Sequence, residues 1–95
     1  MLAIIATLQA KPGQGDALVE ALLDIQPAVR REAGNHAYIV HQASDDTDTI
    51  VMYEQYTDQA ALAAHGKHLK DIGGAVNELL AGRPDIRLLN LHARD

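Results

Sequence analysis

The pattern of hydrophobic and polar positions divides the chain into strand-like and helix-like segments. Met1–Ala10 is rich in β-formers, is apolar on both faces and ends at Lys11-Pro12-Gly13, a strong stop signal. Asp16–Glu32 repeats apolar residues every three or four positions, the period of a helix that buries one face. The pattern therefore predicts a first strand in a covered sheet, followed by a helix.

The second half of the chain repeats this alternation. His36–Ala43 and Thr49–Tyr56 read as two strands of a β-hairpin around a short, Asp-rich connector. A second helical region is expected over Asp58–Leu80, broken near Gly66 or at Gly73-Gly74, and the last strand over 86–93. An apolar stripe along this helical region includes one ionisable residue, His65.

The order β-α-β-β-α-β predicts an α+β, ferredoxin-like fold, formed by a single domain over residues 1–95. Such a fold has a four-stranded antiparallel sheet with both helices on one face. The chain has no Phe, no Trp and three Tyr, so its core is built from small aliphatic residues. The open face of the sheet is too apolar for a monomer to expose, which predicts a homodimer formed through the sheets.

Composition excludes several classes of partner. The net charge is −5, basic residues are not clustered and aromatic residues are scarce, so nucleic acid is not expected as a ligand. Apolar runs are far shorter than a membrane span, and no basic segment precedes Leu2 as in a signal peptide. The absence of cysteine excludes disulfides and thiolate metal sites. We expect a cytoplasmic protein that does not enter the membrane.

Three stretches of the chain resemble the antibiotic biosynthesis monooxygenase family of dimeric α+β barrels. They are IIATLQAKPGQGDAL, EAGNHAYIVHQ and IVMYEQYTDQAALAAHGKH, and they follow the family's order along nearly the whole chain. The resemblance implies a homodimer. Members of this family include quinol monooxygenases that use molecular oxygen without metal or flavin. Other members degrade haem or isomerise small phosphorylated ketones.

The departures from the family pattern are informative. The haem-degrading branch carries an Asn on the first strand and a Trp on the sheet, whereas this chain has Ala6 and Thr7 there and no Trp. Haem breakdown is therefore disfavoured. Family members often space two histidines five residues apart, but His65 and His68 are three apart. The sequence consequently does not determine how the two histidines are arranged at this edge of the expected pocket.

His65 is the main catalytic candidate. It matches the family's histidine at the mouth of the cavity between helix and sheet, and imidazole has an unperturbed pKa of about 6.5, near cellular pH. It is therefore suited to taking a proton from a phenolic substrate. The alternative is a partly buried histidine that is only hydrogen-bonded to a tyrosine or a backbone carbonyl.

Tyr38 matches the family's tyrosine on the second strand and is expected to assist His65 by hydrogen-bonding a substrate oxygen. The alternative is a core aromatic residue with a satisfied hydroxyl. Further residues are expected to contact the substrate, as polar orienters or apolar lining: Tyr56, Leu62, Leu69, Ile72 and Asn90.

No metal or other cofactor is predicted. His65 and His68 lack a convincing third ligand, because Glu54, the only acid nearby in the sequence, has no known orientation. A solvent-facing His68 is the favoured interpretation. Glu54 is interpreted as a salt-bridge partner of an arginine such as Arg87 rather than as a base.

These features together predict a cofactor-independent monooxygenase that oxidises a small aromatic hydroquinone or anthrone-type phenol with O2. Two alternatives remain open at this stage. One is an isomerase of a small hydroxyketone that uses the same pocket, with His65 moving the proton. The other is a small-ligand-binding dimer without turnover.

Overall fold

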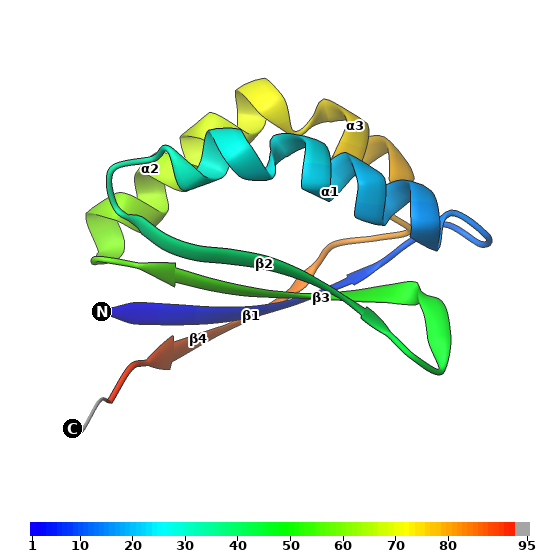
Figure 1. Ribbon diagram of the computed structural model, residues 1–95, viewed down its shortest axis with the longest axis horizontal. Helices are drawn as coiled ribbons and strands as arrows, with labels where there is room; N and C mark the ends of the chain where they lie inside the picture. The colour runs from blue at the N-terminus through cyan, green and yellow to red at the C-terminus, as the bar shows by residue number, and fades with distance from the viewer. Residues whose placement is uncertain (93–95) are drawn as a thin grey trace.

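The structure is a computed structural model that describes residues 1–92. The elements follow one another in the predicted order, with the second helical region divided in two (Figure 1). They are β1 (Leu2–Gln9), α1 (Gly15–Arg30), β2 (Asn35–Ala43), β3 (Asp46–Tyr56), α2 (Gln59–Ile72), α3 (Gly74–Leu79) and β4 (Asp85–Asn90). The ferredoxin-like α+β fold is thus confirmed.

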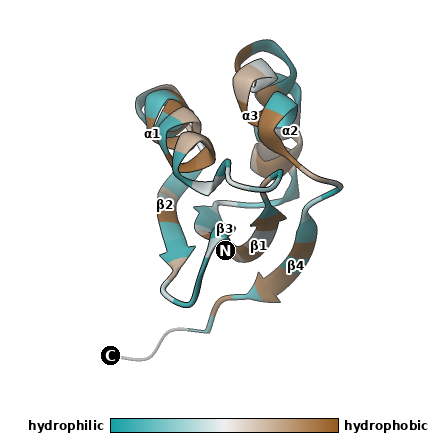
Figure 2. Cartoon of the chain, turned by 90° about the vertical axis from the view of Figure 1, so that its right-hand side faces the viewer, coloured by the Kyte–Doolittle hydropathy of each residue, from teal (hydrophilic) through white to brown (hydrophobic). Residues whose placement is uncertain are grey.

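One antiparallel sheet has the strand order β2-β3-β1-β4, and all helices lie on one of its faces (Figure 2). The register aligns Tyr38, Glu54, Ile4 and Leu88 in one row across the four strands. Residues directly opposite one another on neighbouring strands share a face. This row lies on the helix-side face, because Ile4 belongs to the core that the helices cover.

The hairpin is tighter than the sequence pattern predicts. Strand β3 begins at Asp46 instead of Thr49, which leaves Ser44-Asp45 as the connector. Asp48 lies within the strand, and its carboxylate accepts hydrogen bonds from the backbone N–H groups of Gly13 and Gly15 at 3.0 and 2.9 Å. The Asp48 carboxylate therefore holds the start of α1 against the sheet.

The second helical region breaks at Gly73, one of the two predicted positions, whereas Gly66 lies inside α2. Its N-terminus is capped by the Asp58 side chain, which accepts from the Ala61 N–H at 2.9 Å. His65 is the buried residue of this helix. Strand β4 ends at Asn90, so it is shorter than predicted, and Ala93 lies outside the described residues.

The core lies between α1 and the central strands. Its fully buried large side chains are Tyr56, Leu18, Leu22, Ile50, Met52 and Val29. The edge strand β4 is less well covered: Ile86 and Leu88 point to the helix side, yet they are 59 and 52 % exposed. Space is therefore left between α2 and β4. None of the helices in the described part of the chain is long and apolar enough to cross a membrane.

Candidate active site

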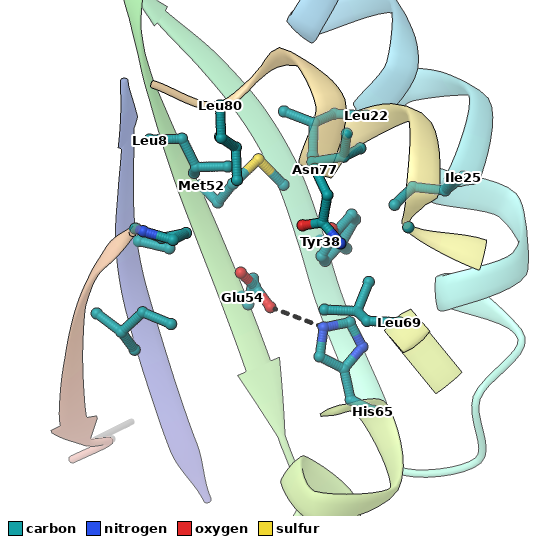
Figure 3. A pocket seen from close by; sticks show the side chains of 15 residues that line it. Leu8, Leu22, Ile25, Tyr38, Met52, Glu54, His65, Leu69, Asn77 and Leu80 are labelled. Atoms are coloured by element: carbon teal, nitrogen blue, oxygen red, sulfur yellow. Dashed lines mark ion pairs between the residues drawn. The ribbon is translucent and has the colours of Figure 1, made fainter. Parts of the chain in front are cut away.

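A cavity of about 130 Å³ lies between the three helices and the inner face of the sheet (Figure 3). Its wall is predominantly apolar, and its few polar side chains are those of Tyr38, Glu54, His65 and Asn77. A dry apolar cavity of about 150 Å³ is known to accommodate a benzene-sized molecule. This inner cavity therefore has the size and polarity suited to one small aromatic ring.

A wider outer groove of about 450 Å³ adjoins the inner cavity. The two share Glu54, His65, Leu69 and Ile86 in their walls. Leu62 lines the groove and Leu88 closes it on the side of β4. Because Glu54 and His65 border both spaces, a ligand that extends from the cavity into the groove passes these two ionisable groups.

The orientation of the His65 ring is fixed by two carboxylates. Its Nδ1 lies 3.0 and 3.1 Å from the two carboxylate oxygens of Glu32, and its Nε2 lies 3.6 Å from Oε1 of Glu54. An ionised carboxylate only accepts hydrogen bonds, so the contact with Glu32 assigns the hydrogen to Nδ1 in the neutral ring. The lone pair is then on Nε2, on the side of Glu54 and the cavity.

Glu32 also contacts His68, whose Nδ1 lies 2.7 Å from Oε2 of the same carboxylate. The His68 side chain is 35 % exposed, whereas those of Glu32 and His65 are 14 and 6 % exposed. Glu32 follows the end of α1, so it joins the first helix to the two histidines of α2. His68 is thus in contact with solvent, as predicted, and its ring is also bonded to Glu32, a partner that the sequence did not predict.

Glu54 is buried and accepts a hydrogen bond from the Tyr56 hydroxyl at 2.7 Å. Burial raises the pKa of Glu54 above its ordinary value, and the charge of Glu32 acts in the same direction; the Tyr56 hydrogen bond and His65 oppose them. The salt bridge predicted with Arg87 is therefore replaced by contacts to Tyr56 and His65. A raised pKa favours the neutral form of the Glu54 carboxyl, and that form can donate a hydrogen bond.

The two tyrosines near His65 remain protonated. Burial, followed by the charge of Glu54, raises the pKa of both Tyr38 and Tyr56 well above the ordinary value. Tyr38 lines the inner cavity, and its ring centroid lies 5.7 Å from that of His65. Tyr38 is therefore a hydrogen-bond donor at the cavity rather than a base.

Of the remaining residues predicted to contact the substrate, some line the cavity or the groove and others do not. Leu69 borders both spaces and Leu62 the groove, while Tyr56 packs beside His65, with ring centroids 5.0 Å apart, and supports Glu54. Ile72 is partly buried against the core, outside the lining of both spaces. Asn90 is exposed on β4, paired with Leu2, and also lies outside that lining. Their roles in binding stay predictions.

Sequence reasoning missed Glu32 and Asn77. Glu32 is the first residue of the stretch EAGNHAYIVHQ, but position alone does not reveal that it reaches two histidines more than 30 residues away. Asn77 lies on α3 and lines the inner cavity. The only signal for Asn77 is a polar side chain one residue after the buried Val76 of a short helix.

Comparisons with known proteins identify the family and the fold of the chain. Residues 1–70 match the family described as antibiotic biosynthesis monooxygenase. The chain belongs to this family. The matched residues include β1, α1, β2, β3 and most of α2, and thus Glu32, Tyr38, Glu54, His65 and His68.

Several solved structures resemble this chain over nearly the full length of both. PA3566 from Pseudomonas aeruginosa is 34 % identical, with a TM-score of 0.84 over 97 % of this chain and 94 % of its own. A candidate antibiotic biosynthesis monooxygenase from Nitrosomonas europaea is 25 % identical, with a TM-score of 0.84 over 95 and 97 %. Rv0793 from Mycobacterium tuberculosis is 25 % identical, with a TM-score of 0.82 over 98 and 96 %. No match is found among the curated proteins.

Within residues 1–92, no group of three or more His, Asp or Glu side chains is arranged to hold a metal ion. Glu32 is joined to His65 and His68 by hydrogen bonds. The prediction that the protein acts without a metal or another cofactor remains to be tested by metal analysis.

Replacing Glu54 by Gln is expected to stabilise the protein increasingly as the pH rises above about 4.5, the ordinary value for the carboxyl. A carboxyl whose pKa is raised by folding binds its proton more tightly in the folded state. The unsubstituted protein therefore loses free energy of unfolding as the pH rises from the unfolded-state pKa through the folded-state pKa of Glu54. The glutamine side chain stays neutral and can still accept from Tyr56. Each tenfold difference in proton affinity corresponds to about 1.4 kcal/mol in the free energy of unfolding.

Denaturant unfolding of both proteins at several pH values between 4 and 8 measures this difference. Glu20→Gln, on the exposed side of α1, is the matched control and should show little pH-dependent change. A difference between Glu54→Gln and the unsubstituted protein that stays constant over this pH range would contradict a raised pKa of Glu54.

Proposed function

We propose that the protein is a cofactor-independent monooxygenase that oxidises a small aromatic hydroquinone or anthrone-type phenol with O2, using His65 as the base. The observation that carries this proposal is the placement of His65. Its Nδ1 is engaged by Glu32, and its Nε2 is directed toward Glu54 at a largely apolar cavity. Family membership supports oxygen chemistry as the class of reaction.

The two adjoining spaces suit a substrate with more than one ring. The inner cavity has the volume for one aromatic ring, and the outer groove accommodates the rest of the molecule. Aliphatic side chains such as Leu69 and Ile86 contact the rings in both spaces. A substrate hydroxyl at the junction lies beside His65, where its proton can be taken up.

The chemistry needs little from the protein beyond the removal of a proton and the exclusion of water. His65 Nε2 accepts a proton from the phenol or from the enol form of the anthrone, which leaves an electron-rich anion in the apolar cavity. This anion donates electrons to O2. For an anthrone-type substrate, one oxygen atom ends as the new carbonyl oxygen, and the other leaves as water with the two hydrogens of the oxidised carbon.

Two neutral donors can stabilise the substrate oxygen during this step. The Tyr38 hydroxyl remains protonated, and Glu54, with its pKa raised by burial, can donate a hydrogen bond in its neutral form. A neutral Glu54 also avoids placing a second negative charge beside the substrate anion. Asn77 provides a further polar group at the cavity wall.

The proposed assembly is a homodimer through the face of the sheet that no helix covers. The row Ile39, Tyr53, Ile5 and Arg87 crosses this face, and Ile39 is 46 % exposed. Three of these four residues are apolar or aromatic, and exposed apolar side chains gathered on a sheet face are typical of a surface that a partner covers. A location in the cytoplasm likewise remains a prediction.

Oxygen uptake by the purified protein tests the proposed reaction. A panel of hydroquinones, naphthohydroquinones and anthrones is expected to contain at least one substrate that consumes oxygen faster than the uncatalysed rate. The assay contains a chelator, so that adventitious metal cannot oxidise the quinol, and isotopically labelled O2 should place one labelled atom in the product. If no member of the panel accelerates oxygen uptake, the monooxygenase proposal is wrong.

A further inference from the structure

His65, Glu32 and His68 form a continuous hydrogen-bonded chain from the inner cavity to the protein surface. His65 is buried at the cavity, Glu32 lies behind it, and the half-exposed ring of His68 contacts the other side of Glu32. Glu32 and His68 line a shallow surface pocket together with Ala28 and Arg31, and they are absent from the lining of the cavity and the groove. They do not touch a ligand bound there.

From this arrangement we infer that Glu32 and His68 are a proton relay that connects His65 to solvent from behind, while a substrate fills the cavity in front. The inference rests on the proposed function for its use in turnover. The relay itself is a property of the three side chains, and it can be measured without a substrate.

The relay transfers one proton outward in balanced steps. When Nε2 of His65 takes a proton from the substrate, the Nδ1 proton passes to the Glu32 carboxylate, 3.0 Å away. In the resting state the ionised Glu32 accepts a hydrogen bond from the Nδ1–H of His68, 2.7 Å away. Once Glu32 is protonated, exchange with water moves the His68 hydrogen to Nε2, so that Nδ1 accepts the proton from Glu32 and Nε2 releases one proton to water. Glu32 is then again ionised, and the reverse sequence returns a proton to His65.

The groups around the chain favour this path over the alternatives. Glu54 faces Nε2 of His65, but it is buried and bonded to Tyr56, so a proton on Glu54 stays inside the cavity. Tyr38 and Tyr56 hold their protons because burial raises the pKa of each. On the surface side, Arg31 is the basic residue that lines the same pocket as Glu32 and His68.

His68→Gln is the sharpest test, because the Gln amide can still donate a hydrogen bond to Glu32 but cannot carry a proton. Exchange of the His65 Nδ1 hydrogen with water, followed by NMR in the intact protein without substrate, is expected to slow by about tenfold or more. His36→Gln is the matched control, since His36 is a histidine on β2 that bonds to Thr57 and not to Glu32. Equal exchange rates in His68→Gln and the unsubstituted protein would overturn the relay.

Turnover provides a second, independent readout. With a substrate from the oxygen-uptake panel and little buffer, His68→Gln should lower kcat about tenfold and leave KM unchanged. Free imidazole should restore the rate, because it delivers and removes protons at the vacated position. Loss of kcat without rescue by imidazole means that His68 has a structural role, and it overturns the relay. If the protein turns over no substrate, the proposed function fails, and the NMR exchange measurement alone decides the relay.

Discussion

Replacing His65 with alanine is expected to lower turnover of the best reduced-quinone or anthrone substrate by about 10²–10⁴-fold, the usual contribution of a general base. The physical reason is that, among the residues that the structure describes, His65 is the only imidazole that lines the cavity. The substitution leaves Glu54, a carboxyl whose pKa burial raises, and two tyrosines that hold their protons. Oxygen uptake with a chelator present measures the effect.

A purely structural role for His65 predicts a different outcome. Its loss leaves Glu32 without one of its two histidine partners, which is expected to lower the free energy of unfolding by about 1–3 kcal/mol. Thermal melting and oxygen uptake on the same preparations therefore separate the two roles. His36→Ala removes an exposed histidine outside the site and should change neither turnover nor the oligomeric state.

If the unsubstituted protein is active and His65→Ala matches its rate, His65 is not the base, although the reaction class survives. Tyr38→Phe would then be the next variant, because the Tyr38 hydroxyl is the other predicted catalytic group at the cavity. Removal of a hydrogen-bond donor without loss of the base should affect the rate less than His65→Ala, if the proposed roles are correct.

The fold was predictable because its signals are local and regular. The apolar alternation of β1, the period of α1 and the glycines at 73 and 74 each report the geometry of one segment, and the order of the elements leaves few topologies. The boundaries were less accurate where side chains act at a distance. The sequence pattern places Asp48 in a polar connector, because its bonds to Gly13 and Gly15 depend on how β3 meets the start of α1.

The site was predictable only in part, for a related reason. Tyr38 and Glu54 lie directly opposite each other on β2 and β3, so the hairpin register brings them together, and family resemblance adds His65. Glu32 could not be placed, because the sequence does not determine where the end of α1 lies relative to α2. The sequence also does not determine strand order and register. Arg87 lies opposite Ile5 on β1, on the other face of the sheet from Glu54, so the two side chains do not meet.

The burial of His65 is explained by its position in the apolar stripe of α2 together with the polar partners that surround its ring. In an ordinary amphipathic helix the apolar stripe is the most buried part, but Leu62 and Leu69 of α2 border open space and are only partly buried. His65 lies deeper than either because Glu32, Glu54 and two tyrosine rings surround it. An ionisable ring can occupy this stripe because the stripe borders a cavity and the ring has polar partners on both sides.

The second large expected effect concerns assembly: Ile39→Asp should convert a dimer into a monomer at micromolar protein concentration. Ile39 is 46 % exposed on the sheet face without helices, in the row with Tyr53 and Ile5, so the isolated subunit tolerates the charge. In a two-fold symmetric dimer the same substitution occurs twice in the interface. An unpaired polar or charged group buried there costs at least about 2 kcal/mol, so two copies weaken association by about 4 kcal/mol, or about 10³-fold in Kd.

Sedimentation velocity over a range of concentrations measures this change against the expected mass of twice 10.2 kDa. Leu23→Asp is the matched control, because Leu23 is 40 % exposed on α1, on the side of the sheet away from the proposed interface, and its substitution should leave the dimer intact. A dimer that survives Ile39→Asp but dissociates with Leu23→Asp would move the interface to the helices. A protein that sediments as a monomer without any substitution would show that the open face of the sheet stays exposed, and the proposed homodimer would be wrong.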